Sequence, residues 1–319
     1  MAQIDIFNGD ADGICALTQL HHAEPRSSTL ITGVKRDIAL VEKAEPLPGD
    51  QITVLDVSFD KNRDGVSRAL AAGAEIFYID HHFAGHVPDD PKLNTIIDTD
   101  PNVCTSLLVN GHLRGAFLEW AITGAFGDNL KGTARELATP LDLPEERLAL
   151  LDVLGTCINY NAYGGSLDDL HFAPDTLFRL VSPYSSPFLF IEEASGTFKA
   201  LKAGYDQDMA SAASLSPMRE SKVAAVFVFP DAPWARRVSG VYSNDLANAS
   251  PGRAHAVLTE RADGTYLVSV RAPLDDKRDA DTLCRRFPTG GGRAAAAGIN
   301  ALSEAKLGAF IDALEATYG

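Results

Sequence analysis

The chain has 319 residues, 45% of them hydrophobic, a length and composition typical of a globular protein with two domains. Its formal net charge of −15 argues against a surface that binds long duplex DNA by neutralising many phosphates. Scattered cysteines, acidic first residues and the lack of an apolar run of about 18 residues argue against a disulfide framework, a secretory signal and a membrane partner, so we expect a cytoplasmic protein.

Five short apolar runs rich in Ile and Val lie in the first third of the chain and alternate with helical patterns. We expect strands at residues 3–8, 28–34, 51–57, 75–80 and 94–98. This alternation predicts an α/β fold in which helices cover both faces of a parallel sheet. In such sheets the ligand site lies just beyond the carboxyl ends of the strands.

The segment IFYIDHH, residues 76–82, ends an apolar strand on an acid and two histidines. Burial of these groups without partners is costly, so the strand end should face water or hold a compensating cation. Hard oxygen and imidazole donors follow other strands too, which favours manganese, magnesium or iron over zinc. Each aspartate alone would also suit a helix cap or a turn. The donors are Asp10, Asp12, Asp56, Asp80, His81 and His82, with Asp128 in FGDN as a further candidate.

The rest of the chain has a mostly helical region and then a second pattern of strands. Helical patterns cover 117–129 and 143–160, further strands are expected at 222–229, 254–260 and 264–270, and a helix with Ser303 as its N-cap at 303–318. The predicted division is a first domain at 1–185, a connector at 186–220 and a smaller α/β domain at 221–319.

Four motifs in order resemble those of the DHH phosphoesterase superfamily: NGDADG (8–13), VLDVSF (54–59), DHH (80–82) and FGDN (126–129). VSVRAP (268–273) and FPTGGGRAAAAG (287–298) resemble its DHHA1 substrate-binding module. The resemblance implies a parallel-sheet DHH catalytic domain and a smaller DHHA1 domain, bilobal with a cleft between them. The superfamily includes RecJ-like exonucleases, nanoRNases that also act on adenosine bisphosphate, cyclic-dinucleotide phosphodiesterases and pyrophosphatases, all of which use a manganese pair.

The resemblance also implies roles for individual residues. Asp56 would bridge two Mn²⁺ ions, for which Mg²⁺ or another divalent ion is an alternative. The other proposed ligands are Asp10, Asp12, His81, Asp128 and the amide of Asn8. Two such ions can activate a shared water and neutralise phosphate oxygens during in-line displacement.

His82 would be catalytic, facing the substrate to stabilise the transferring phosphoryl group or to protonate the leaving oxygen. Asp80 would fix the orientation of a histidine from behind it. The chain departs from the family pattern at Ile6, where many relatives have a histidine, and at Asn8, where the exonuclease-like pattern has an acid. Less negative charge at Asn8 should weaken the affinity for the first metal.

A glycine run in the second domain is a candidate phosphate site. Gly290, Gly291 and Gly292 allow a backbone nest that binds anions, and Arg293, which replaces the family's histidine, would clamp a phosphate together with Arg271. The alternative is a tight turn with solvated arginines.

These observations predict a metal-dependent phosphoesterase that hydrolyses phosphate esters of small nucleotides or short single-stranded oligonucleotides. The alternative is a nucleotide-binding regulator with weakened catalysis. The sequence leaves open the preferred base and linkage, and whether the protein acts as a monomer or a homodimer.

Overall fold

The computed structural model describes all residues from 1 to 319. The chain forms two compact units, Met1–Gly204 and Tyr205–Gly319. The division lies inside one continuous helix, α9 (Ser195–Ala213), and therefore inside the segment that the sequence predicts as a connector. This segment is largely helical, because α8 (Pro187–Glu193) directly precedes α9. The domain limits 1–185 and 221–319 stay a prediction.

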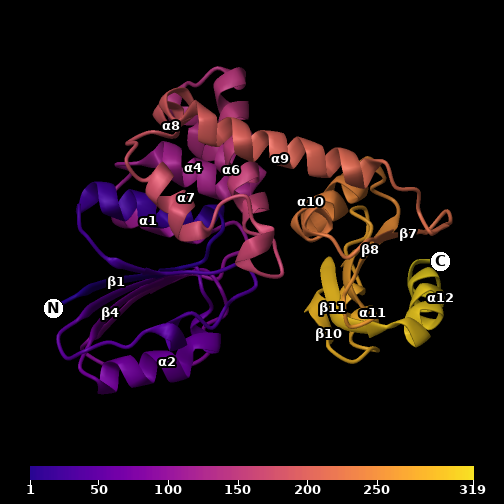
Figure 1. Ribbon diagram of the computed structural model, residues 1–319, viewed down its shortest axis with the longest axis horizontal. Coiled ribbons are helices and arrows are strands. Elements are labelled where there is room, and N and C mark those ends of the chain that lie inside the picture. The colour runs from indigo at the N-terminus through magenta and orange to yellow at the C-terminus, as the bar shows by residue number, and fades with distance from the viewer. The chain divides into compact units, whose positions relative to one another are not determined.

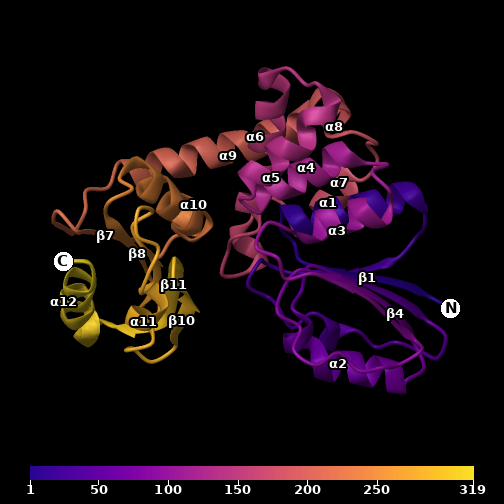
Figure 2. The ribbon, with the colours of Figure 1, turned by 180° about the vertical axis from the view of Figure 1, so that it is seen from behind.

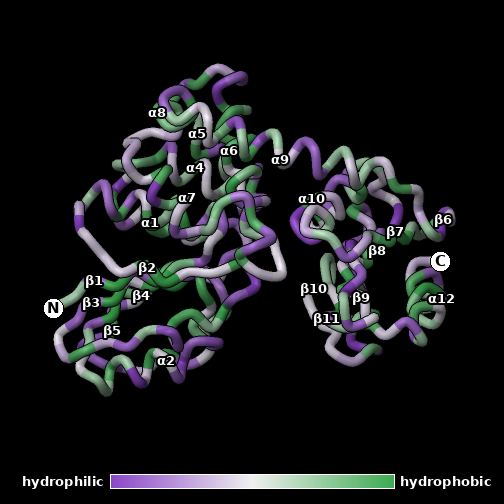
Figure 3. The backbone as a smooth tube through the Cα atoms, viewed as in Figure 1, coloured by the Kyte–Doolittle hydropathy of each residue, from purple (hydrophilic) through white to green (hydrophobic).

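The first unit is built on a five-stranded parallel sheet, as the sequence predicts. The strand order is β2-β1-β3-β4-β5, and every neighbouring pair is parallel. The strands are β1 (Gln3–Phe7), β2 (Thr29–Ile31), β3 (Gln51–Leu55), β4 (Glu75–Asp80) and β5 (Leu93–Ile97). The central strands are hydrophobic along most of their length (Figure 3), because residues on both faces of a parallel sheet are covered.

Helices cover both faces of this sheet. Helix α2 lies on one face, and α1 with the helices that follow β5 lies on the other (Figures 1 and 2). The α-helices of this part are α1 (Ala11–Ala23), α2 (Phe59–Ala71), α3 (Thr105–His112), α4 (Leu118–Gly127), α5 (Lys131–Ala138), α6 (Glu145–Asn161) and α7 (Pro174–Val181). Short 3₁₀ turns lie at Val41–Lys43, Thr139–Leu141 and Leu167–Asp169.

The core between the sheet and α2 contains side chains from the central strands of the sheet. Val54 of β3 and Tyr78 of β4 are fully buried there together with Phe59 and Val66 of α2. The Tyr78 hydroxyl donates a hydrogen bond to the Val57 carbonyl at 2.6 Å, so its polar atom is satisfied inside the apolar layer.

Two glycines allow α4 and α6 to pack closely. A Cβ atom added at Gly155 would lie 2.2 Å from the Thr123 carbonyl oxygen and 2.8 Å from the Gly127 nitrogen. A Cβ atom at Gly127 would meet the Ala11 Cβ atom of α1 at 2.3 Å. Gly127 is the last residue of α4, and Asp128 follows immediately.

The second unit contains a mixed sheet in the order β10-β11-β9-β8-β7-β6, in which only β7 and β8 are parallel. Its elements are β6 (Arg219–Glu220), β7 (Ala224–Phe229), α10 (Pro233–Ala249), β8 (Ala254–Glu260), β9 (Thr265–Arg271), α11 (Ala280–Cys284), β10 (Gly290–Arg293), β11 (Ala296–Ser303) and α12 (Leu307–Tyr318). Helix α10 connects the parallel pair β7 and β8, and the predicted hairpin joins β8 to β9.

The terminal helical segment begins directly after Ser303, as predicted, but its first turn is not α-helical. Ser303 is the last residue of β11, and a 3₁₀ turn, Glu304–Lys306, separates it from α12. Its side chain makes no capping hydrogen bond. No helix of the protein has both the length and the apolar character needed to cross a bilayer.

Candidate metal centre

The carboxyl ends of three neighbouring strands bring the predicted donors to one edge of the sheet. Asp56 follows β3, and Asp80 ends β4, with His81 and His82 directly after it. Ligand atoms of Asp56, His81 and His82 lie within 4.8 Å of one another. Asp10 follows β1, which pairs with β3, and its carboxylate starts helix α1.

Asp10 and Asp12 are both helix caps, but of different helices. The Oδ1 atom of Asp10 accepts hydrogen bonds from the amides of Asp12 at 3.0 Å and Gly13 at 3.1 Å at the start of α1. The two oxygens of Asp12 accept hydrogen bonds from the Thr105 and Ser106 amides, both at 2.7 Å, at the start of α3. Each oxygen of Asp12 accepts one of these bonds and keeps a second lone pair, so this cap can also bind a cation.

Asp56 lies in an unusual backbone conformation in the centre of this cluster. Its φ angle of 58° is in the left-handed region, and its side chain is buried. Such strain of a non-glycine residue is common at functional sites, where neighbouring structure maintains it. Burial and then the negative charges of Asp10 and Asp12 raise the pKa of Asp56 well above its ordinary value. A cation at this position would relieve that repulsion.

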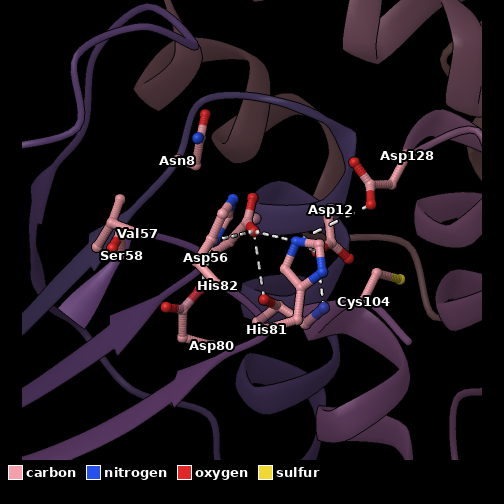
Figure 4. A network of polar contacts seen from close by, with 12 residues as sticks. Asn8, Asp12, Asp56, Val57, Ser58, Asp80, His81, His82, Cys104 and Asp128 are labelled. Atoms are coloured by element: carbon pink, nitrogen blue, oxygen red, sulfur yellow. Dashed lines mark hydrogen bonds and ion pairs between the residues drawn. The ribbon is translucent and has the colours of Figure 1, made fainter. Parts of the chain in front are cut away.

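His81 points one ring nitrogen toward the carboxylates (Figure 4). Its Nδ1 atom lies 2.9 Å from the Val103 carbonyl oxygen and therefore donates the ring proton there. The Nε2 atom then carries a lone pair, and it faces Asp56 at 3.4 Å, Asp128 at 3.9 Å and Asp12 at 4.0 Å. A ring nitrogen without a proton among three carboxylates is the arrangement of a metal ligand.

His82 differs from His81 in its partner and its exposure. Its Nδ1 atom lies 2.7 Å from Oδ1 of the fully buried Asp80, and its side chain is 45% exposed. Burial acts to lower the pKa of His82, but the hydrogen bond and charge of Asp80 outweigh it and raise the pKa. Asp80 thus orients His82, while a backbone carbonyl orients His81.

The structure has two observations that fit a bound cation. The Oδ1 atom of Asn8 is buried without a hydrogen-bond partner, although buried polar atoms are nearly always paired. The donor set combines carboxylate oxygens, an amide oxygen and an imidazole, which suits manganese or magnesium. The residues present therefore fit a divalent metal ion.

Asp128, at the end of α4, is the most exposed of the predicted aspartate ligands, with 23% of its side chain accessible. Burial raises the pKa of Asp128 to about 6, although the Lys35 ammonium acts in the opposite direction. Figure 4 shows its carboxylate directed toward His81 from the helical side of the site.

Lys35 is a site residue that the motifs do not predict. It follows β2, and its Nζ atom lies 2.6 Å from Oδ2 of Asp10 and 2.8 Å from Oδ1 of Asn159. Although burial opposes ionisation, the Lys35 charge holds the pKa of Asp10 below its ordinary value. The sequence contains one indication that Lys35 belongs to the site, because this lysine lies just beyond the end of a strand that pairs with β1.

The predicted phosphate-binding residues belong to the second unit. Gly290, Gly291 and Gly292 are not a loop but part of the edge strand β10 with Arg293, paired with β11. Successive amides of a strand point to opposite sides, whereas a nest directs them to one side, so this backbone differs from the predicted nest. Arg271 donates to Oδ1 of Asn244 at 2.7 Å and thereby contacts α10. Arg293 is exposed. Phosphate binding by these residues stays a prediction.

No protein-family model matches the sequence, and no curated protein matches it. Several solved structures match nearly the whole chain. Exonuclease RecJ bound to manganese is 18% identical with a TM-score of 0.59, covering 99% of this chain and 90% of its own. RecJ from Thermus thermophilus in complex with Mn²⁺ is 19% identical with a TM-score of 0.63, covering 99% of this chain, which spans only 52% of that structure.

The third similar structure is PggH, a pGpG-specific phosphodiesterase from Vibrio cholerae. It is 13% identical with a TM-score of 0.56, and the match covers 100% of this chain and 99% of that one. These identities are low, so the likeness concerns the fold. The chain has a RecJ-like fold, as expected from the resemblance of its sequence motifs.

Proposed function

We propose that this protein is a divalent-metal-dependent phosphoesterase that hydrolyses phosphate ester bonds of small nucleotides or short oligonucleotides. The observation that carries the proposal is the position of His81 Nε2, which faces Asp12, Asp56 and Asp128 within 4.0 Å. A divalent ion held there would lower the pKa of a water and neutralise phosphate oxygens.

His82 is the residue of this site best suited to act on the substrate. Its Nδ1 proton is directed to Asp80, and its side chain is the more exposed of the two histidines. The raised pKa of His82 increases the share of the doubly protonated ring near neutral pH. In that form Nε2 carries a proton that it can donate to a phosphate oxygen or to the leaving group.

The similar structures support a nucleotide-like substrate. Two are RecJ exonucleases with manganese, and one is a phosphodiesterase specific for pGpG. The net charge of −15 favours small substrates over long duplex DNA, because a polyanion would be repelled. We therefore place short, flexible phosphodiesters first among the candidate substrates, with manganese as the metal to be tested first and magnesium as the alternative.

The proposal is tested with the purified protein, manganese and three substrates: a chromogenic phosphodiester, a linear dinucleotide and adenosine bisphosphate. We expect hydrolysis of at least one of them, abolished by EDTA and restored by added Mn²⁺. The His82→Ala variant, purified in the same way, identifies any contaminating hydrolase.

Product formation that is equal in the His82→Ala variant would refute the assignment of the activity to this site. Binding of a nucleotide without turnover at any metal concentration would instead identify a regulator.

A further inference from the structure

Lys35 places a positive charge inside the cluster of metal-ligand candidates. Its Nζ atom contacts Oδ2 of Asp10 at 2.6 Å and Oδ1 of Asn159 at 2.8 Å, and it lies 4.0 Å from Oδ1 of Asp128. A carboxylate, an amide oxygen and a second carboxylate are also the donors that a hard divalent ion takes. The ammonium group therefore occupies a cation position.

The backbone and the side chain of Lys35 are both held in place. Its amide donates to the Ala162 carbonyl at 2.9 Å, and its own carbonyl accepts a hydrogen bond from Asn8 Nδ2 at 3.5 Å. The ammonium group lies 5.3 Å from the centre of the Tyr163 ring, within the range of a cation–π contact. Only 22% of the side chain is exposed, so the charge belongs to the site rather than to the surface.

Asp10 has little capacity left for a metal ion. Its Oδ1 atom accepts two amide hydrogen bonds at the start of α1, and its Oδ2 atom is bound to Lys35. A divalent ion at Asp10 would come within a few ångströms of the ammonium group, and two cations so close repel each other strongly in a buried site. The ion and the lysine therefore compete for this position.

The neighbouring positions on β1 are poor in ionic donors as well. Ile6 is fully buried in the core between the sheet and α2, and Asn8 contributes an uncharged amide whose Oδ1 atom has no partner. The positive charge of Lys35 thus lies where the chain has the fewest negative ligands.

The part of the site around His81 has more negative ligands than the part around Asp10 and Lys35. Asp56 faces the Nε2 atom of His81 at 3.4 Å, and Asp128 faces the same atom at 3.9 Å. Asp128 faces the two positions with different oxygens: Oδ1 lies 4.0 Å from the Lys35 ammonium, beyond hydrogen-bond distance, and Oδ2 lies 3.9 Å from His81 Nε2, so Oδ2 and the oxygens of Asp56 remain available to a divalent ion.

We propose that the Lys35 ammonium replaces one of the two cations, so that the site binds a single divalent ion at Asp56, His81 and Asp128. The Lys35 charge then neutralises Asp10 permanently and independently of the metal concentration. This inference rests on the metal centre of the proposed function but not on any substrate or turnover.

The test is the number of Mn²⁺ ions bound at saturation, measured by isothermal titration calorimetry and by metal analysis after gel filtration. We expect one ion per chain in the wild type and in Lys35→Arg, and two in Lys35→Met and Lys35→Gln. Lys43→Met removes an exposed lysine, whose side chain is 47% accessible, and should keep one ion. Electron paramagnetic resonance should detect an exchange-coupled manganese pair only in the two uncharged Lys35 variants.

Two ions in the wild type would overturn this inference and leave the proposed function intact, and that measurement needs no variant. A single ion in both folded uncharged variants, with near-ultraviolet circular dichroism like the wild type, would also overturn it. No bound manganese in any form would refute both the inference and the metal-dependent function.

Discussion

Two adjacent histidines with different partners are the clearest feature at the scale of single residues. His81 donates to a backbone carbonyl and turns its free nitrogen inward, whereas His82 donates to Asp80 and is open to solvent. The sequence DHH alone does not distinguish the two rings. We infer the role of each histidine from which of its ring nitrogens already makes a hydrogen bond.

Replacement of each histidine by alanine should therefore have a different effect. His81→Ala should lower the affinity for Mn²⁺ because it removes an inward-facing lone pair. His82→Ala should keep bound manganese but lower kcat by about 10²–10⁴-fold, the usual effect of losing a general acid. Metal analysis and steady-state kinetics measure the two effects, with the exposed His86→Ala as the control. An equal loss of metal in both variants would contradict this division.

Asp56 combines a left-handed backbone, burial and repulsion by other carboxylates. Because its pKa is raised on folding, ionisation of this carboxylate disfavours the folded state, and the stability it contributes at low pH is lost as the pH rises through the raised pKa. Ionisation of Asp56 without a cation nearby therefore costs stability, which indicates a functional reason for an acid at this position.

Asp56→Asn should therefore separate stability from activity. We expect hydrolysis to fall by more than about 100-fold, beyond the effect of losing a residue that only supports a metal ligand. The melting temperature of the metal-free variant at pH 7 should rise, because the buried charge is removed. Asp64→Asn, an exposed aspartate of α2, is the matched control for both measurements. A metal-free variant that melts below the wild type would refute the repulsion argument.

At the scale of elements, the site depends on how helices approach the sheet edge. Asp12 belongs to α1 but caps α3, so a single carboxylate links two helices at the candidate metal centre. Asp128 is delivered by the end of α4, whose position depends on the glycine contact with α6.

Gly155→Ala tests the contact between α4 and α6. The new Cβ atom would lie 2.2 Å from the Thr123 carbonyl oxygen, so the helices must separate. We expect a loss of about 1–3 kcal/mol in the free energy of unfolding, measured with urea, and a weaker affinity for Mn²⁺ because Asp128 moves.

The control is Gly111→Ala in α3, where a Cβ atom would meet open space. This change should be neutral or should stabilise the protein by up to about 1 kcal/mol, because alanine favours a helix over glycine. Equal destabilisation by the two substitutions would show that space between α4 and α6 is not the cause.

At the scale of the whole molecule, we expect the two units to respond to different conditions, the first to metal ions and the second to acid. The candidate metal centre lies in the first unit, whereas the second contains His255, a fully buried histidine of β8. Neither ring nitrogen of His255 makes a hydrogen bond of normal geometry. Burial and then the positive charge of Arg253 lower the pKa of His255 to about 4.

Acid should consequently lower the free energy of unfolding of the second unit. A lowered histidine pKa means that the unfolded state binds more protons, so stability is complete above about pH 6.5 and is lost as the pH falls toward about 4. The loss should be about 3 kcal/mol at the low end, from about 1.4 kcal/mol per pKa unit.

His255→Leu should remove this loss, because no titrating group remains at the position. Urea unfolding between pH 7 and pH 4 measures it, with the fluorescence of Trp234 in a Trp120→Phe background reporting on the second unit. His86→Gln controls for the removal of a histidine as such. A pH profile that His255→Leu leaves unchanged would show that other groups cause the acid sensitivity.

The sequence by itself determined the parallel sheet and the edge where the donors collect. Apolar runs that alternate with helical patterns become strands whose two faces are covered by helices. Because the carboxyl ends of parallel strands meet on one side, the sequence already placed Asp56 and His81 at the same edge of the sheet. Only the tertiary structure decided which nitrogen of His81 is free, since Val103 reaches its ring across 22 positions of the chain, and only the folded backbone showed that Asp80 contacts His82. Lys35 reaches Asp10 across 25 positions of the chain, and the glycines of the predicted nest became an edge strand by pairing with β11. Such contacts depend on which distant backbone is adjacent, and no local pattern of residue types encodes that.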